Sequence, residues 1–266
     1  MKIAVVNSKG GVGKTTTAVT LGILLGKKKR VLVVDMDPQA HATSCLLNFL
    51  PDKRNTIYPV LLELRDIKDV VTESQYGIDV VPSCPDLAAV DLFLLNQPER
   101  NKKLRKALSQ IEGNYDFIFI DCPPSLGPLS LNALVAADRA IIPISPGELP
   151  FLAMIETLKV MVEVYRKENR GLKPLGFLPT MIEGKTRIAR ETLEKLSGDL
   201  TLVVDGKEIT IKIPILPTIP KSVRVAEEPS RRPIIFHPSH PVTRAYEKVA
   251  EILEEIHGNS RVGCAS

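Results

Sequence analysis

The chain has 266 residues, a length typical of one α/β domain, and 44% of them are apolar while 25% are charged. These proportions match soluble globular proteins and exclude a chain that is disordered throughout. No apolar run reaches the roughly 18 residues of a membrane span, and the apolar start is too short for a signal peptide. We therefore expect a cytoplasmic protein. The net charge of +4 is only mildly basic and identifies no partner by itself.

Short apolar runs rich in β-branched residues recur along the chain and predict strands. They cover residues 3–7, 31–35, 78–82, 117–121, 140–144, 175–180 and 215–219. Continuous apolar runs are typical of strands buried on both faces of a parallel sheet. Helical spacing of apolar residues marks the segments 14–25, 102–111, 130–137, 152–165, 187–196 and 243–257. This alternation predicts an α/β fold with a doubly wound, mostly parallel sheet flanked by helices.

One short segment departs from this alternation. Asp205-Gly206 stands between two β-rich runs within residues 202–211, and Asp-Gly in that setting is a strong signal for a two-residue hairpin turn. We expect a small β-hairpin inserted late in the α/β domain. No linker rich in Gly, Ser or Pro divides the chain, so we expect one domain over residues 1–258 and a flexible tail over residues 259–266.

A glycine-rich segment lies between the first predicted strand and the first predicted helix. It reads Ser8-Lys9-Gly10-Gly11-Val12-Gly13-Lys14-Thr15-Thr16. Glycines let backbone N–H groups turn toward an anion, and a helix N-terminus adds its dipole. Lys14 is spaced to reach the β- and γ-phosphates of a nucleotide, and the Thr15 hydroxyl to bind Mg²⁺. The match is not literal, because Ser8 stands where the common phosphate-binding string begins with glycine. The segment predicts a nucleotide site.

Two other predicted strands end in aspartate. One runs into Asp35-Met36-Asp37-Pro38-Gln39, and the other ends in Asp121 before Cys122-Pro123-Pro124. The carboxyl ends of parallel strands form the edge at which such sheets bind ligands, so these carboxylates are expected near the phosphate loop. An alternative for Asp35 and Asp37 is an ordinary helix cap and turn, because Asp-Pro often starts one.

These three motifs, in this order, resemble those of the ParA/MinD family of deviant Walker A ATPases, whose signature is K-G-G-x-G-K-[ST]-T. The resemblance covers residues 2 to about 256. It implies a P-loop NTPase fold with ATP and Mg²⁺ as ligands, and it implies that Lys9 reaches across a dimer to the partner's phosphates. Asp35, Asp121 and Thr15 are then expected near Mg²⁺, and Asp37 is expected to orient the attacking water. The residues expected at ATP are Lys9, Gly10, Gly11, Val12, Gly13, Lys14, Thr15, Thr16, Met181, Pro217 and Pro220, of which Lys9 and Lys14 join Asp37 as catalytic residues.

The same resemblance implies contacts to DNA. Basic residues at corresponding places contact DNA in ParA proteins, which assigns Arg224 and, less directly, Lys185 and Arg187 to a DNA surface. No extension that could read a DNA sequence precedes the first predicted strand, so we expect non-specific binding to double-stranded DNA. The partners that the family implies are a second copy of the chain, joined in an ATP-dependent homodimer, and a ParB-like centromere-binding protein.

The expected function is therefore ATP-dependent DNA partition of a plasmid or chromosome, with the protein on the nucleoid when ATP is bound. One alternative is a MinD-like membrane-cycling ATPase, which would need a basic amphipathic helix at its C-terminus. The apolar stripe of residues 246–256 is instead accompanied by four glutamates, and we interpret it as core packing. Another alternative is a reductase that carries an iron–sulfur cluster, but Cys84 and Cys122 each stand beside proline, outside the Gly-rich setting of such loops.

Overall fold

The computed structural model describes residues 1–94, 97–184, 186–222 and 240–262. In these residues seven strands form one sheet, in the order β3-β4-β2-β5-β1-β6-β7. All neighbouring strands are parallel except β3 and β4. The strands are β1 (Lys2–Val5), β2 (Val31–Asp35), β3 (Thr72–Glu73), β4 (Asp79–Val81), β5 (Phe117–Asp121), β6 (Arg139–Ile144) and β7 (Lys173–Pro179). The predicted doubly wound, mostly parallel sheet is confirmed.

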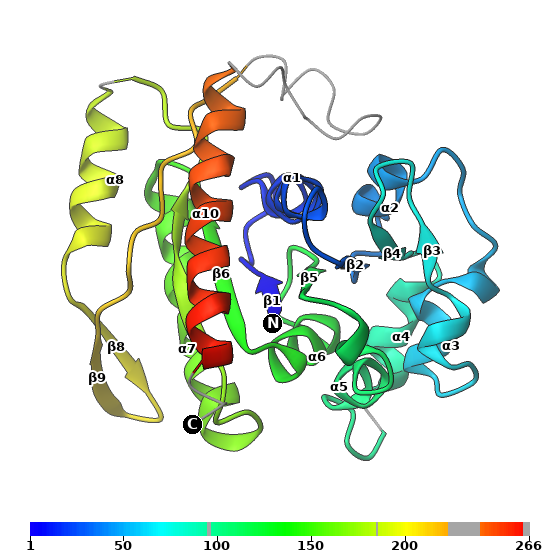
Figure 1. Cartoon of the computed structure of the whole chain (residues 1–266). Coiled ribbons are helices and arrows are strands. Elements are labelled where there is room, and N and C mark those ends of the chain that lie inside the picture. The colour runs from blue at the N-terminus through cyan, green and yellow to red at the C-terminus, as the bar shows by residue number, and fades with distance from the viewer. Residues whose placement is uncertain (95–96, 185, 223–239, 263–266) are drawn as a thin grey trace.

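Apolar side chains on both faces of the central strands explain why their sequences do not alternate with polar residues. In β2, Val31 and Val33 join the core that lies under helices α1 and α10, whereas Leu32 and Val34 join the core on the opposite face. Each face is closed by helices, as Figure 1 shows. The helices are α1 (Lys14–Gly26), α2 (His41–Leu46), α3 (Ile57–Leu61), α4 (Leu87–Leu94), α5 (Lys103–Leu108), α6 (Pro128–Ala136), α7 (Glu148–Lys167), α8 (Arg187–Ser197) and α10 (Pro241–Val262).

The predicted hairpin is also confirmed. Strands β8 (Leu200–Val204) and β9 (Lys207–Ile211) pair antiparallel around a two-residue turn. Asp205 and Gly206 have φ of +53° and +71°, the left-handed pair that a type I′ hairpin turn requires. Leu202 and Val204 are buried in the same apolar core as the inner face of α7, so the hairpin extends this core beyond the edge of the main sheet.

The strand predicted at residues 215–219 is wrong. This segment forms only isolated parallel bridges, between Phe177 and Ile215 and between Ile182 and Pro220. Prolines at 214, 217 and 220 lack the backbone N–H that a continuous ladder needs. The segment still runs beside β7, since the Ile219 N–H donates to the Pro179 carbonyl at 2.7 Å.

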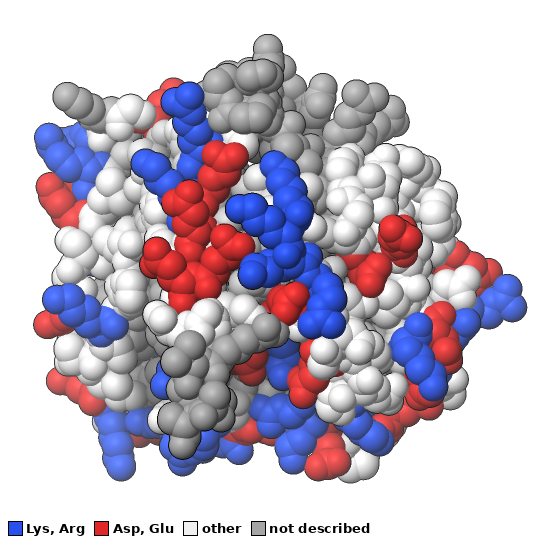
Figure 2. All heavy atoms as spheres, in the orientation of Figure 1, with Lys and Arg blue, Asp and Glu red and all other residues white. Residues whose placement is uncertain are grey.

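The C-terminal helix α10 packs its apolar stripe against α1, which confirms the interpretation of that stripe as core. Tyr246, Val249 and Leu253 are buried, and the Tyr246 hydroxyl shares a 3.1 Å hydrogen bond with Thr17 of α1. Figure 2 shows acidic side chains gathered over α10 beside basic ones over α1. Among the described residues, no helix is long and apolar enough to cross a membrane.

Candidate functional site

The phosphate loop follows β1 and leads into α1 at the carboxyl edge of the sheet. Gly11 and Gly13 have φ of +74° and +90°, a conformation that side-chain-bearing residues rarely adopt. Thr180, which follows β7, contacts the loop: its hydroxyl donates to the Val12 carbonyl at 2.8 Å. A Cβ atom on Gly13 would lie 3.6 Å from the Thr180 methyl group. The glycines therefore set the path of the loop, and Thr180 holds it against the sheet.

Ser8, which stands in place of the usual glycine, ties the loop to α7. Its backbone N–H donates to the Thr157 hydroxyl and its own hydroxyl donates to the Ala153 carbonyl, both at 3.2 Å. Thr157 is buried and lies on the side of α7 that faces the loop. The departure from the common string thus has a structural reason, because the Ser8 hydroxyl makes a contact that glycine could not.

The two lysines of the loop lie in different environments. Lys14 is only 6% exposed, and its ammonium group donates to the Lys9 carbonyl at 3.0 Å. Burial lowers the pKa of Lys14, while the nearby charges of Asp121, Cys122 and Asp37 act in the opposite direction. The side chain of Lys9 is exposed and forms no ion pair with another residue in the described part of the chain.

Asp35 and Asp121 lie side by side at the ends of β2 and β5, where they are register partners. Both are fully buried. One Asp35 oxygen accepts hydrogen bonds from the backbone N–H and the hydroxyl of Thr43, at 2.8 and 2.7 Å, and the other accepts from the Asp37 N–H at 3.1 Å. Burial nevertheless raises the pKa of Asp35 to about 6, because these bonds offset only part of the desolvation.

Asp121 lacks such support. Neither of its buried carboxylate oxygens has a hydrogen-bond partner of ordinary geometry among the described residues. Burial and the neighbouring Asp35 raise the pKa of Asp121 well above its usual value, and the Thr15 hydroxyl and Lys14 oppose this rise. A buried carboxylate without partners is costly, so this position fits a carboxylate that completes its contacts with a bound cation.

The donors gathered at this point suit Mg²⁺. Thr15 and the two aspartates offer hard oxygen atoms, and Mg²⁺ binds through one or two carboxylates while it keeps several waters. Among the described residues, no group of three His, Cys, Asp or Glu side chains could by itself hold a metal ion. These residues would hold Mg²⁺ beside the phosphate loop.

Asp37 follows Asp35 in the same loop and is 7% exposed. One oxygen of its carboxylate accepts from the Gln39 N–H at 2.9 Å. This contact is typical of a turn that starts at Asp, which was the alternative interpretation of this residue. Asp37 also contributes to the electrostatic environment of Lys14. Asp37 is therefore close enough to Lys14 for the charges of the two side chains to interact.

The residues expected at the base lie on two segments that are joined by backbone hydrogen bonds. Met181 follows β7 in a left-handed conformation, with φ of +54°, and is 37% exposed. The next residue, Ile182, donates its N–H to the Ile219 carbonyl at 3.0 Å, and it forms a parallel bridge with Pro220. Thr180, the residue before Met181, contacts the phosphate loop, so this part of the chain lies next to that loop.

The expected DNA contacts are only partly visible. Arg187 is exposed at the start of α8 and pairs with Glu191, one turn later, at 2.6 Å. Lys185 and Arg224 lie outside the described residues. The paired Arg187 has the geometry of a solvent-exposed helix pair, and no other described basic side chain adjoins it in a hydrogen bond or ion pair.

Sequence reasoning missed Thr43 and Ser83. Thr43 binds Asp35, and the Ser83 N–H donates to the Thr43 hydroxyl at 2.8 Å. Thr43 lies in α2, which is too short to show a helical period, and Ser83 follows β4 in a segment without a known motif. The one available signal was position, because Ser83 comes directly after a predicted strand, at the ligand-binding edge.

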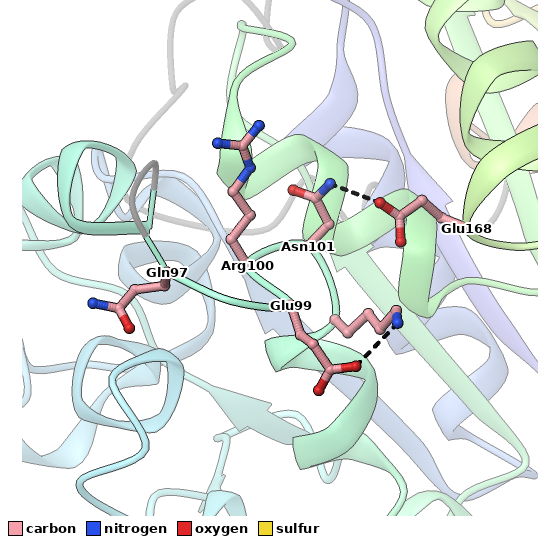
Figure 3. Close-up of a pocket in the computed structure, with 6 residues that line it drawn as sticks. Gln97, Glu99, Arg100, Asn101 and Glu168 are labelled. Carbon is pink, nitrogen blue, oxygen red and sulfur yellow. Dashed lines mark hydrogen bonds and ion pairs between the residues drawn. The ribbon is translucent and has the colours of Figure 1, made fainter.

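A polar hollow of about 370 Å³ lies elsewhere, between the start of α5 and the end of α7. Figure 3 shows Asn101 facing Glu168 across it, with a hydrogen bond of 3.1 Å between them. Lys102 pairs with Glu99 at 3.1 Å. The end of α7 is followed in the chain by the start of β7. This hollow therefore lies near the amino ends of the strands, whereas the phosphate loop lies at their carboxyl ends.

The chain resembles known proteins over nearly its whole length. A family model described as an AAA domain matches residues 1–173. The sporulation initiation inhibitor protein Soj of Bacillus subtilis is 35% identical over 260 residues, which cover 97% of this chain and 98% of Soj. The chromosome partitioning protein ParA of Myxococcus xanthus is 39% identical over 239 residues, which cover 88% of this chain and 81% of ParA.

Solved structures give the same fold. Cobyrinic acid a,c-diamide synthase from Mycobacterium smegmatis, with a bound ATP analogue and magnesium, has a TM-score of 0.78 and 31% identity, over 95% of this chain and 93% of that one. A putative plasmid partition protein from Borrelia burgdorferi, bound to AMPPNP, has a TM-score of 0.77 and 27% identity, over 96% of this chain and 98% of that one.

Proposed function

Because this chain belongs to the ParA/Soj family of P-loop ATPases, we propose that it hydrolyses ATP to ADP and phosphate and that it partitions DNA. The observation that carries the ATPase proposal is the buried Lys14 near the buried Asp121, whose carboxylate has no hydrogen bond of ordinary geometry among the described residues, beside a glycine loop. A buried cation next to two buried carboxylates provides one group for phosphates and two for a divalent ion. The solved structures with nucleotide support the same assignment.

In this proposal the loop amides and the start of α1 bind the phosphates, and Lys14 contacts the β- and γ-phosphates. Thr15, Asp35 and Asp121 hold Mg²⁺ directly or through water, and the ion neutralises charge on the phosphates. Asp37 orients the water that attacks the γ-phosphate. Its carboxylate need not be a strong base, since phosphoryl transfer depends mainly on positioning and on charge stabilisation.

The variant Asp37→Ala tests this division of roles. Hydrolysis should fall at least about tenfold, because the water is no longer oriented, while the affinity for ATP stays within about twofold. Asp52→Ala is a matched control, since Asp52 pairs with Arg54 on the surface. This control variant should hydrolyse ATP like the parent. Hydrolysis by Asp37→Ala at the parent rate would remove Asp37 from the mechanism.

The second half of the proposal concerns DNA. ATP would join two copies of the chain, with the exposed Lys9 of each on the phosphates of the other, and the dimer would bind double-stranded DNA of any sequence. A ParB-like partner would stimulate hydrolysis and release the DNA. The support comes from the partition proteins among the relatives. The buried stripe of α10 favours DNA over a membrane as the target, because the described apolar side chains of this stripe are packed in the core instead of facing lipid.

DNA retention with and without Mg-ATP, with anionic liposomes in parallel, tests this half. DNA should be retained only with Mg-ATP, and liposomes should retain none. The logarithm of affinity should fall with the logarithm of salt concentration, by about 0.9 for each phosphate contact. Arg224→Ala should reduce that slope by about one to two units per dimer and weaken the binding of all DNA sequences alike. Arg187→Ala tests whether Arg187 exchanges its pairing with Glu191 for a contact to DNA. Retention on liposomes instead of DNA would favour the membrane-cycling alternative.

A further inference from the structure

Residues 83–91, which lead from β4 into α4, contact the loop that carries Asp35 and Asp37 and the first turn of α6, the helix that follows the Asp121 loop. At their start, the buried Ser83 donates its hydroxyl to the Asp37 carbonyl at 2.7 Å. Its backbone N–H donates to the hydroxyl of Thr43 at 2.8 Å, and Thr43 in turn binds the Asp35 carboxylate. Ser83 thus supports the backbone of one aspartate and the side-chain partner of the other.

At the far end of this segment, Asp91 contacts α6. One oxygen of its carboxylate accepts from the Leu129 N–H at 3.0 Å, in the first turn of the helix that follows the Asp121 loop. The residue at the N-cap of α6 is Gly127, which has no side chain to cap the helix. Asp91 supplies an acceptor for this turn. A Cβ atom on Gly127 would come within 3.3 Å of Asp91, so the glycine permits this approach.

The two loops start from neighbouring strands. Asp35 and Asp121 are register partners at the ends of β2 and β5, and both are buried. Residues 83–91 connect the structure around both aspartates, since hydrogen bonds at either end attach this short segment to the Asp35–Asp37 loop and to the first turn of α6.

We propose that Ser83 and Asp91 are positioning residues, which hold the Asp35–Asp37 loop and the Asp121 loop in the arrangement that hydrolysis requires. This inference rests on the proposed ATPase function. The two side chains act through the backbone of the loops and not on the nucleotide. Loss of either should therefore lower kcat and leave the binding of ATP nearly unchanged.

Ser83→Ala removes the hydroxyl bond to the Asp37 carbonyl but keeps the Ser83 N–H bond to Thr43, and Asp91→Ala removes the bond to Leu129. Each should lower kcat about five- to tenfold, the effect expected for one buried hydrogen bond, with KM within about twofold. The double variant should lose less than the product of the two effects, because both attachments serve one arrangement. Asp91→Asn keeps an acceptor oxygen and should restore most of kcat.

Two controls separate positioning from general stability. Ser74→Ala removes another buried serine hydroxyl, which accepts from the Tyr76 N–H far from the loops. Asp86→Ala removes a carboxylate within residues 83–91 that pairs with Lys53 on the surface. Both should have the kcat of the parent. Equal losses of kcat in the controls, or a rise in KM that matches the fall in kcat, would overturn the inference.

Amide hydrogen exchange without nucleotide gives a readout that does not depend on ATPase activity. Asp91→Ala should speed exchange at Leu129 and also in residues 37–43. Ser83→Ala should speed exchange in residues 37–43 and also at Leu129. If the parent chain hydrolyses no ATP, the proposed function fails while exchange still decides this inference. Faster exchange confined to the loop next to each substitution would show two independent contacts and overturn it.

Discussion

The carboxyl edge of the sheet and the region around the polar hollow both hold clustered charges, but they hold them differently. At the edge, Lys14, Asp35 and Asp121 are buried, and among the described residues Asp121 has no hydrogen-bond partner of ordinary geometry, although the Thr15 hydroxyl interacts with it. Around the hollow, Lys102 pairs with Glu99, and Glu63 receives both Lys103 and Lys106 at 2.6 and 2.7 Å. The Lys102–Glu99 and Lys106–Glu63 pairs lie at the surface, where water also solvates them, whereas the Lys103 side chain is only 12% exposed.

This difference separates a ligand site from a structural charge network. Burying a charge without a full set of partners is costly, and a fold retains such an arrangement where a ligand supplies what is missing. Exposed ion pairs contribute little because water screens them. The density of charge in a sequence therefore says less about function than the burial of each charge and the number of its partners.

The largest expected effect is that of Lys14→Ala. ATP affinity should fall about 100-fold and hydrolysis should be lost, because charge-assisted contacts to the β- and γ-phosphates are removed. Titration with a fluorescent ATP analogue and a phosphate-release assay measure both. Lys9→Ala is the matched control within the same loop, and its isolated chain should bind ATP like the parent. Hydrolysis by Lys14→Ala at the parent rate would remove the edge of the sheet as the nucleotide site.

A smaller effect is expected from Asp121→Asn, which should raise the free energy of unfolding in the absence of Mg²⁺. The folded state holds the pKa of Asp35 and of Asp121 above the ordinary value near 3.8, so it binds more protons than the unfolded state between the two values. The free energy of unfolding should then fall as the pH rises from about 4 through about 6 in the absence of Mg²⁺. Asp121→Asn removes one of the two charges and should reduce this fall.

At pH 7.5 without Mg²⁺, Asp121→Asn should be more stable than the parent, because it removes a carboxylate whose ionised form is disfavoured by burial. With Mg-ATP the order should reverse, because only the parent gains from binding. Urea denaturation with and without Mg-ATP measures both differences. A variant less stable than the parent without Mg²⁺ would show that the Asp121 carboxylate is satisfied within the protein, which would weaken the contrast between the two regions.

The smallest effect is expected from Lys106→Ala in the surface network. Its side chain is 73% exposed, and Lys103 remains to pair with Glu63. The Tm should stay within about 1 °C of the parent and ATP hydrolysis should not change. Differential scanning calorimetry at low and moderate salt checks this. A fall in Tm of more than about 3 °C would mean that the surface pairs contribute as much as buried ones.

Local sequence was sufficient wherever neighbouring residues carried the signal. The apolar runs predicted six strands of the main sheet within two residues of their bounds, and Asp205-Gly206 predicted the hairpin turn. The glycine loop, Asp35, Asp37 and Asp121 could be assigned to one edge because parallel strands place their carboxyl ends together. Three helices were not predicted: α2 and α3 span six and five residues, too few to show a helical period, and α4 was also missed.

Tertiary structure alone decided which groups meet across long stretches of chain. Prolines turned the apolar residues 215–219 away from a regular ladder, although their composition favours a strand. Ser83 meets Asp37 across 46 positions, Asp91 meets Leu129 across 38, and Thr180 meets Val12 across 168. Composition likewise could not show that Asp121 lacks a hydrogen-bond partner while Asp35 has three donors. Such contacts depend on how strands are ordered in the sheet and where helices cross it, so they leave no periodic or local signal in the sequence.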